Sequence, residues 1–396
     1  MNIRIQPNKL HGSIRILPSK SQAHRLLICA AFADGITKIQ CAQTNADIEA
    51  TADCLRAIGA NIRRCDEYYE VTPISGIPAS AELFCRESGS TLRFLLPVVG
   101  ALGIDTVFHM EGRLPYRPLT PLWEELERMG CVLSRPSETT IRCIGKLKPG
   151  EYQIDGGISS QYITGLLFAL NLLDGESKLT ITGKIESKPY IDLTKNALAL
   201  FGADPEAPGR KSLISPGSIS VEGDWSNGAF FIAANALGSK LEIRGLHPDS
   251  AQGDRICKDL IDRLLANPIV IDAADIPDLV PILSVVAAAN HGANFTNIRR
   301  LRIKESDRVQ SICEMLHSLG CKTDASENEL TVYPGSFHAC TINAYNDHRI
   351  AMSAAIAATV ASGPVTICGA ECVTKSYPHF WAEYARTGGI YEQHLR

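Results

Sequence analysis

Charged side chains are concentrated in a few short stretches of this 396-residue chain. The densest stretch contains Lys304-Glu305-Ser306-Asp307-Arg308, at the start of a helix-like run. Lysine and arginine at this spacing can bind a phosphate or carboxylate group, and the neighbouring glutamate can carry a proton. A single stretch of this kind could equally be a solvated charged turn. Anion binding is favoured over a solvated turn because the chain repeats a similar arrangement elsewhere.

Six further polar motifs each stand directly before an apolar run that ends near a glycine. One residue from each motif marks the period: Ser19, Ser88, Ser159, Ser226, Asp278 and Asn346. Successive markers are 67 to 71 residues apart, except for 52 residues between the fourth and the fifth. So regular a period predicts a repeated supersecondary unit.

Each repeat has a second half, in which an amphipathic helix ends in an apolar residue, a glycine and a small residue, as at Leu319-Gly320-Cys321. Two short strands follow, so the repeat is predicted to be β-α-β-α-β-β, in an α/β (or α+β) fold. The fourth repeat is shorter because the helix over residues 255–266 leads directly to Pro268, and one hairpin is missing there.

The first helix of each repeat is apolar nearly all round, which predicts that it is buried with sheets outside it. The polar motifs then fall at helix N-termini, which attract anions. Cations in and near these motifs are Lys20, Arg25, Arg93, Arg117, Lys304, Arg308, Arg349 and Lys375. Any one of them could instead pair locally with a carboxylate. Their repeated placement favours ligands that carry phosphate and carboxylate groups.

Two carboxylates stand among these cations. Asp278 opens a buried helix, and Glu305 is next to Lys304. A carboxylate among cations stays ionised and can act as a base, whereas one in a drier place can act as an acid. The alternative for Asp278 is a structural role as the N-terminal cap of its helix.

Composition limits the classes of protein to which the chain can belong. Hydrophobic residues make up 45% and charged residues 21%, which is typical of globular proteins. The net charge of −4 gives no bulk cationic surface for nucleic acid or membrane. The longest nearly apolar run, residues 350–361, is shorter than the about 20 residues of a membrane-spanning helix, and no apolar signal core is present. We expect a soluble cytoplasmic protein and, since no exposed apolar stripe is evident, a monomer.

The 13 cysteines are scattered, form no C-x-x-C pair and have no histidines at zinc spacing. Reduced buried thiols are therefore expected, and no metal site.

Taken together, the motifs resemble those of the EPSP synthase family. The resemblance rests on Pro18-Ser19-Lys20-Ser21 with Arg25, Ser159-Ser160-Gln161, Ser187-Lys188-Pro189-Tyr190, Ile276-Pro277-Asp278, Lys304-Glu305-Ser306-Asp307-Arg308, Asn346-Asp347-His348-Arg349 and Lys375-Ser376-Tyr377-Pro378. These motifs occur in the order found in the family and cover nearly the whole chain.

The resemblance implies two domains, an inside-out α/β barrel architecture with three repeats in each domain, and an active site in the cleft between them. Residues 19–222 would form the shikimate 3-phosphate side. Residues 1–18 with 223–396 would carry the catalytic carboxylates and part of the phosphoenolpyruvate site. The implied reaction transfers the enolpyruvyl group of phosphoenolpyruvate to the 5-hydroxyl of shikimate 3-phosphate, without metal or organic cofactor.

The resemblance also assigns roles by position. The catalytic residues would be Asp278 as the base for the 5-hydroxyl, Glu305 as the proton carrier at the methylene carbon, and Lys20 in contact with both substrates. Shikimate 3-phosphate would be bound by Lys20, Ser21, Arg25, Ser159, Ser160, Gln161, Ser187, Tyr190, Asp278 and Lys304. Phosphoenolpyruvate would be bound by Lys20, Gly89, Arg117, Gln161, Arg308, Arg349 and Lys375.

The sequence departs from the family pattern at Arg300, where the family commonly has an asparagine that contacts the shikimate phosphate. The turn Glu87-Ser88-Gly89-Ser90 also differs from the commoner Asn-Ala-Gly-Thr.

Three alternatives remain open. A related enolpyruvyl transferase that acts on UDP-N-acetylglucosamine generally has a reactive cysteine on a mobile loop, and residues 110–121 contain none. An RNA 3′-phosphate cyclase would need a nucleotide site and an adenylated histidine, for which His24 and His348 lack the context. A non-catalytic repeat scaffold would have no use for carboxylates among the cations.

Overall fold

The structure, a computed structural model, describes residues 1–205 and 213–394 of the chain. Helices and strands alternate along the chain, so the protein has an α/β fold. The chain divides into two compact units. One unit consists of Met1–Leu17 and Gly223–Arg396, and the other of Pro18–Glu222, so the chain passes from one unit to the other twice.

In the unit Pro18–Glu222, three buried helices form the core together with more amphipathic helices that pack on them. The buried helices are α1 (Lys20–Ala31), α3 (Gly89–Leu102) and α5 (Ser160–Leu170). The others are α2 (Ala46–Ala57), α4 (Leu122–Arg128) and α6 (Lys188–Leu200). Helices α1, α3 and α5 are buried on nearly all sides because apolar residues surround them.

The strands of this unit lie in three sheets. The first has the order β12 (Ser218–Ser220), β3 (Thr37–Gln40), β5 (Tyr68–Thr72), β4 (Asn61–Arg64). The second has the order β6 (Ser80–Arg86), β7 (Asp105–Met110), β9 (Thr140–Gly145), β8 (Cys131–Ser137). The third pairs β10 (Glu151–Asp155) with β11 (Lys178–Thr182) in parallel.

The unit formed by Met1–Leu17 and Gly223–Arg396 has the same kind of core. Its buried helices are α7 (Trp225–Ala236), α9 (Val280–Ala289) and α11 (His348–Ala358). Its other helices are α8 (Cys257–Ala266), α10 (Arg308–Ser318) and α12 (Phe380–Arg386). Helices α7, α9 and α11 pack against one another in a single hydrophobic core.

Three sheets complete this unit. The first has the order β18 (Cys340–Asn343), β19 (Val365–Cys368), β1 (Asn2–Gln6), β20 (Ile390–His394). The second has the order β14 (Ile269–Asp272), β15 (Ala293–Thr296), β17 (Glu329–Val332), β16 (Thr323–Ala325). The third pairs β2 (His11–Arg15) with β13 (Lys240–Arg244) in parallel.

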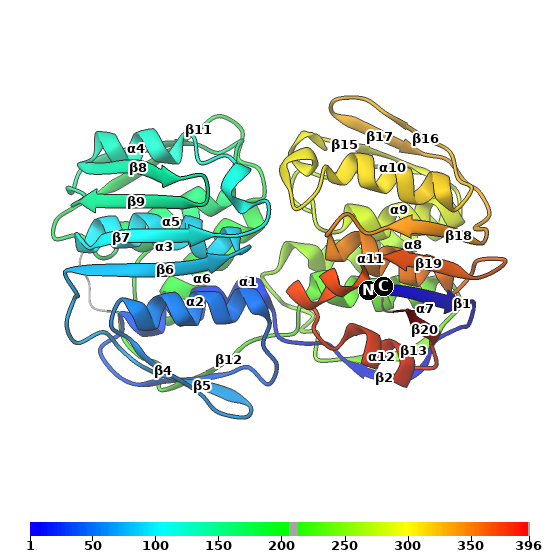
Figure 1. Cartoon of the computed structure of the whole chain (residues 1–396), viewed down its shortest axis with the longest axis horizontal. Helices are drawn as coiled ribbons and strands as arrows, with labels where there is room; N and C mark the ends of the chain where they lie inside the picture. Colours follow the sequence, from blue (N-terminus) through cyan, green and yellow to red (C-terminus); the bar gives the residue numbers. More distant parts are fainter. Residues whose placement is uncertain (206–212, 395–396) are drawn as a thin grey trace. The chain divides into compact units, whose positions relative to one another are not determined.

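The four-stranded sheets share one topology, in which a parallel pair is followed by two antiparallel strands. In the first sheet of this unit, β1 supplies one of the antiparallel strands, although it is the first strand of the chain. Figure 1 shows β1, in blue, between the red strands β19 and β20.

Four of the six buried helices begin at polar side-chain caps. Side-chain oxygens accept backbone N–H groups at Ser88, Ser159, Asp224 and Asp347, the N-caps of α3, α5, α7 and α11. A polar cap satisfies one of the N–H groups that a helix leaves unbonded at its start. The polar motifs of the sequence therefore lie at helix N-termini, and the apolar runs behind them form the core.

One local prediction differs from the structure, and a second falls partly outside the described residues. The alternating run Ser13-Ile14-Arg15-Ile16-Leu17 predicts a strand at these residues. The strand lies two residues earlier, at His11–Arg15, because β13 pairs with it from His11 to Arg15. After α6 the sequence predicts a hairpin for the third repeat, and residues 206–212 of that stretch lie outside the described residues. The strand that follows, β12, pairs with β3 rather than with β10 or β11.

Candidate active site

A group of charged side chains surrounds Asp278 in the unit formed by Met1–Leu17 and Gly223–Arg396. One carboxylate oxygen of Asp278 accepts a hydrogen bond from Nη1 of Arg308 at 2.8 Å and lies 3.9 Å from Nζ of Lys304. The other accepts from Nη2 of Arg349 at 3.1 Å. Arg308 also donates to Glu305 at 2.8 Å. We call these five residues the Asp278 cluster.

Three members of the Asp278 cluster stand at or just before the start of a helix. Asp278 stands two residues before α9, Arg308 is the first residue of α10, and Arg349 is the second residue of α11. Lys304 follows the short 3-10 helix η3 (Arg299–Ile303). Asp278 does not cap α9, because the N-cap is Leu279 and makes no side-chain cap bond. The carboxylate of Asp278 points instead to the three cations.

The cations keep Asp278 ionised. Burial alone would raise the pKa of its carboxyl group, but the charges of Arg349, Lys304 and Arg308 outweigh burial and hold the pKa well below its ordinary value. Burial lowers the pKa of Lys304 to about 8, because the nearby Asp278 offsets only part of the lost hydration. The side chains of Lys304 and Asp278 are 20% and 21% exposed, so a ligand can reach both.

Asp347 holds Arg308 from the other side. Its carboxylate is fully buried and accepts from Nε of Arg308 at 3.0 Å and from the hydroxyl of Ser306 at 3.0 Å. The same side chain caps α11 by accepting from the backbone N–H of Arg349 at 3.0 Å. The sequence gives Asp347 only as part of the Asn346-Asp347-His348-Arg349 motif, and its contact with a residue 39 positions away is visible only in the fold.

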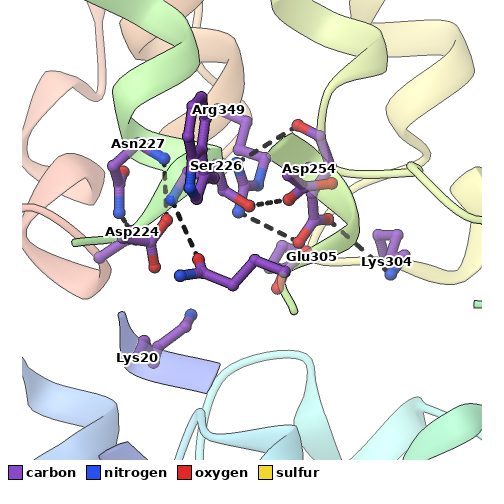
Figure 2. A network of polar contacts seen from close by, with 12 residues as sticks. Lys20, Asp224, Ser226, Asn227, Asp254, Lys304, Glu305 and Arg349 are labelled. Carbon is purple, nitrogen blue, oxygen red and sulfur yellow. Dashed lines mark hydrogen bonds and ion pairs between the residues drawn. The ribbon is translucent and has the colours of Figure 1, made fainter. Parts of the chain in front are cut away.

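A second carboxyl group lies near this cluster. Asp254, in the 3-10 helix η2 (Gly253–Ile256), is buried and accepts a hydrogen bond from the hydroxyl of Ser226. Burial and the negative charge of Asp278 raise the pKa of Asp254 to about 7. Figure 2 shows Asp254 and Ser226 with Arg349, Lys304 and Glu305. One carboxyl is therefore held ionised while its neighbour can hold a proton near neutral pH.

Lys375 lies at the end of the 3-10 helix η4 (Ala370–Lys375). Its ammonium group donates to the backbone carbonyl of Asn346 at 3.1 Å, so it stands beside the turn that leads into α11. The neighbouring Ser376 accepts a hydrogen bond from the Asn227 amide at 3.3 Å, which links η4 to the first turn of α7.

In the unit Pro18–Glu222, the first two turns of α1 carry the three predicted residues Lys20, Ser21 and Arg25. The ammonium group of Lys20 pairs with Asp47 at 3.0 Å. Arg25 is buried and donates to the hydroxyls of Thr194 at 2.8 Å and Thr164 at 3.3 Å.

The same guanidinium group of Arg25 also donates to two backbone carbonyls. It reaches that of Ser21 at 2.6 Å and that of Tyr190 at 2.8 Å. Four hydrogen bonds within the protein leave one of the five guanidinium N–H groups for a ligand. Arg25 therefore joins α1 to α5 and α6 before any ligand binds.

A second cluster of this unit lies at the N-terminus of α3. A side chain at Gly89 would put its Cβ 2.6 Å from Nη1 of Arg93 and 2.8 Å from Nη1 of Arg117, so two guanidinium groups meet above this glycine. Arg93 donates to the Gln161 side chain at 2.8 Å, and Gln161 donates to the Ser90 hydroxyl at 3.0 Å. Two cations at a helix N-terminus favour an anionic ligand. We call Gly89, Ser90, Arg93, Arg117 and Gln161 the Gly89 cluster.

The remaining predicted residues lie at the starts of α5 and α6. Ser159 caps α5 by accepting from the Gln161 N–H at 3.3 Å, and Ser160 is the buried first residue of that helix. Ser187 precedes α6 in the left-handed conformation, with φ of 56°, and is buried. The backbone carbonyl of Tyr190 accepts from Arg25, so this residue holds the α1 turn through its main chain.

The predicted residues thus fall into groups within each unit. Asp278, Lys304, Glu305, Arg308 and Arg349 come together in one unit, and Lys375 stands at the turn before α11. In the other unit Gly89, Arg117 and Gln161 come together, while Lys20, Ser21 and Arg25 lie in the first two turns of α1. Asp47, Arg93, Asp254 and Asp347 are further contacts that the sequence did not assign.

Within residues 1–205 and 213–394, no three or more His, Cys, Asp or Glu side chains are grouped so that they could hold a metal ion. In the same part of the chain, no helix is long and apolar enough to cross a membrane.

The protein has an α/β fold in which lysine and arginine side chains gather at helix N-termini, with carboxylates beside them in the Asp278 cluster. The family model of EPSP synthase (3-phosphoshikimate 1-carboxyvinyltransferase) matches residues 5–384. A 3-phosphoshikimate 1-carboxyvinyltransferase of Clostridium kluyveri is 36% identical and aligns over 98% of this chain and 97% of its own. One from Clostridium beijerinckii is 37% identical over 99% and 98% of the two chains. The chain belongs to the EPSP synthase family.

Solved structures share the fold. EPSP synthase from Acinetobacter baumannii superposes with a TM-score of 0.81 at 24% identity, covering 99% of this chain and 100% of that one. The enolpyruvyl transferase NikO from Streptomyces tendae has a TM-score of 0.76 at 19% identity, covering 99% and 98%.

Proposed function

We propose that this protein is a 3-phosphoshikimate 1-carboxyvinyltransferase that joins the 5-hydroxyl oxygen of shikimate 3-phosphate to C2 of phosphoenolpyruvate. The hydroxyl loses its proton and the methylene carbon gains one, giving a tetrahedral intermediate. The C2–O bond to phosphate then breaks, a proton leaves the methyl group, and the enol ether and inorganic phosphate are released. Membership of the EPSP synthase family over nearly the whole chain supports this reaction.

The observation that carries the proposal is the environment of Asp278. Three cations hold its carboxylate ionised at neutral pH, while part of its surface stays exposed. An ionised carboxylate that a ligand can reach can take the proton of a hydroxyl group. We assign this role to Asp278 and the transfer of a proton at the methylene carbon to Glu305, which Arg308 holds at 2.8 Å.

The cations of both units are assigned to the acidic groups of the substrates. Lys304 and Asp278 would meet the reacting end of shikimate 3-phosphate, and Lys20 would contact both substrates. Further contacts to shikimate 3-phosphate are proposed for Ser21, Arg25, Ser159, Ser160, Gln161, Ser187 and Tyr190. Phosphoenolpyruvate is assigned to Lys20, Gly89, Arg117, Gln161, Arg308, Arg349 and Lys375. Two guanidinium groups above Gly89 support an anion there.

For the architecture, we propose an inside-out α/β barrel of six β-α-β-α-β-β repeats in two domains. Buried α1, α3 and α5 in one unit and buried α7, α9 and α11 in the other support it. So does the shared topology of the four-stranded sheets. Residues 19–222 would serve shikimate 3-phosphate, and residues 1–18 with 223–396 would supply the catalytic carboxylates. We propose a cytoplasmic monomer.

The direct test is phosphate release by the purified protein. We expect release when phosphoenolpyruvate and shikimate 3-phosphate are both present, and none with either compound alone. Release with UDP-N-acetylglucosamine in place of shikimate 3-phosphate would reassign the protein to the related transferase class.

The role of Asp278 is tested by Asp278→Asn, which keeps the shape of the side chain but removes the base. We expect kcat to fall by about 10²- to 10⁴-fold, the usual contribution of a positioned base, while both substrates still bind in a calorimetric titration. The matched control is Asp259→Asn, because Asp259 lies in the same unit on the exposed side of α8 and pairs only loosely with Arg263, at 3.7 Å. Turnover of Asp278→Asn equal to that of Asp259→Asn would exclude Asp278 as the base.

A further inference from the structure

A chain of buried hydrogen bonds joins the starts of three helices in the unit Pro18–Glu222. Nδ1 of His24 in α1 lies 2.7 Å from the hydroxyl oxygen of Thr51 in α2. That hydroxyl lies 2.7 Å from the hydroxyl of Thr91 in α3, which donates to the Ser88 hydroxyl at 2.7 Å. All four side chains are at most 1% exposed. No assigned substrate contact belongs to this chain.

The direction of the hydrogen bonds determines the tautomer of His24. Thr91 gives its hydroxyl proton to Ser88, which as the cap of α3 also accepts the Thr91 N–H at 3.2 Å. Thr91 can therefore only accept from Thr51, and Thr51 in turn can only accept from His24. His24 must donate through Nδ1, which leaves Nε2 without a proton. Nε2 is buried and has no hydrogen-bond partner among the described residues.

His24 stands among residues assigned to the substrates. It follows Lys20 by one helical turn in α1 and directly precedes Arg25. The partner residues repeat this spacing, because Lys20 pairs with Asp47 and His24 pairs with Thr51, again one turn further along α2. Two contacts one turn apart fix both the position and the rotation of α1 against α2.

The far end of the chain reaches the Gly89 cluster. Ser88 and Thr91 flank Gly89 and Ser90 in the first turn of α3. Phe94, one turn further along α3, meets the His24 ring edge-on at 6.2 Å between ring centres and lies 5.1 Å from the Arg25 guanidinium carbon. His24, which belongs to the helix of the Lys20 turn, therefore directly contacts α3, the helix that carries the Gly89 turn.

From this geometry we infer that His24, as a neutral Nδ1-protonated imidazole, is a positioning residue that holds the Lys20 turn of α1 in register with the Gly89 turn of α3 through Thr51 and Thr91. The inference rests on the proposed function for the roles of Lys20 and Gly89. A neutral ring is needed because an imidazolium would add a third positive charge beside Lys20 and Arg25. Burial and those two charges hold the pKa of His24 well below its ordinary value.

The kinetic test compares variants of His24 and Thr51. His24→Leu removes the donor, and Thr51→Val replaces one hydroxyl by a methyl group of the same size. We expect each to lower kcat/KM for both substrates by about tenfold to a hundredfold, since displacing a substrate-binding turn by about 1 Å can cost a hundredfold. His24→Asn places an amide N–H near the position of Nδ1 and should recover most of the loss.

The double variant His24→Leu/Thr51→Val separates positioning from general damage to the core. Because both changes break the same chain, we expect the double variant to be no slower than the slower single variant. The matched control is Thr106→Val, which removes an equally buried hydroxyl that donates only to the Ile104 carbonyl, at 3.1 Å, in the same unit. Losses that multiply in the double variant, or an equal loss in Thr106→Val, would overturn the inference.

A spectroscopic measurement tests the same inference without any variant. Nitrogen-15 chemical shifts of the wild-type His24 ring should show a proton on Nδ1 and none on Nε2 throughout the active pH range. A proton on Nε2 would overturn the inference even if every variant were inactive. If the wild-type protein releases no phosphate, the proposed function is contradicted, but the tautomer of His24 is not. The nitrogen-15 chemical shifts alone then decide whether the tautomer assignment is correct.

Discussion

At Lys304, the loss of water around a buried ammonium group competes with the attraction of Asp278. Burial prevails and brings the pKa of Lys304 to about 8, so the residue changes charge close to physiological pH. If the charged form binds the reacting end of shikimate 3-phosphate, kcat/KM should fall by about tenfold for each pH unit above about 8, as the protonated fraction does. The measurement is a pH–rate profile of kcat/KM for shikimate 3-phosphate.

Lys304→Arg provides the comparison for this profile. Arginine stays protonated far above pH 8, so the decline should move to higher pH, even though the different shape of the side chain lowers the rate at every pH. A decline at the same pH in both proteins would mean that another group causes it.

The role of Asp278 can be predicted only in part from the sequence. Its position before an apolar run is compatible with a helix cap or with a base. The fold excludes the cap, because Leu279 is the N-cap of α9, and it brings Arg308 and Arg349 from distant segments to the carboxylate. For Arg25, the sequence suggests a ligand contact, and the fold adds a structural role. The sequence places it beside the Lys20 motif, but four internal hydrogen bonds show that much of its role is to join helices.

Helices α3 and α5 pack closely against each other. They approach at Gly165, where an added Cβ would lie only 2.2 Å from the backbone carbonyl oxygen of Arg93 and 3.0 Å from Pro97. A backbone atom cannot move aside as a side chain can, so Gly165→Ala must push the two helices apart. We expect a loss of about 1–3 kcal/mol in the free energy of unfolding, the usual cost of overpacking.

Chemical denaturation of the variant protein checks this expectation. A matched control is Gly76→Ala in the same unit, where an added Cβ meets nothing within 4 Å. Since Arg93 also orients Gln161, Gly165→Ala should in addition raise KM for phosphoenolpyruvate. Equal stability of the two alanine variants would show that the helices separate without cost.

The elements themselves follow from local patterns that a sequence displays. Apolar runs behind Ser88, Ser159 and Asp224 form buried helices, because a side-chain cap and an apolar surface both act within one segment. Strand partners are harder to predict. Nothing in the local pattern around Ser218–Ser220 indicates that this strand extends the sheet of β3, about 180 residues earlier in the chain, because pairing depends on the whole fold.

On the scale of the whole molecule, β1 is the element that ties one end of the chain to the other. It pairs with β19 through Ile3↔Ile367 and with β20 through Ile5↔Tyr391, and both isoleucines are fully buried. Deleting residues 1–17 should therefore open the sheet of β18, β19 and β20 and unfold that unit, while the unit Pro18–Glu222 keeps its own core.

Hydrogen exchange read by mass spectrometry distinguishes the two units in this experiment. Amides of β19 and β20 should lose protection in the deletion variant, and those of β6 and β7 should keep it. Arg4→Glu serves as the control, because Arg4 is an exposed residue of the same strand and its replacement leaves the pairing intact. Retained protection of β19 after the deletion would show that β1 is dispensable.

The position of β1 in the sheet also determines the order in which the two units can fold during translation. Residues 18–222 can complete their core as soon as they leave the ribosome, whereas β1 must wait unpaired until the later segment containing β19 and β20 has been translated. At about 5–20 residues per second, this delay lasts on the order of 20 to 80 s. During that interval the nascent chain carries an unpaired strand with two uncovered isoleucines, and this is where chaperone binding should be sought.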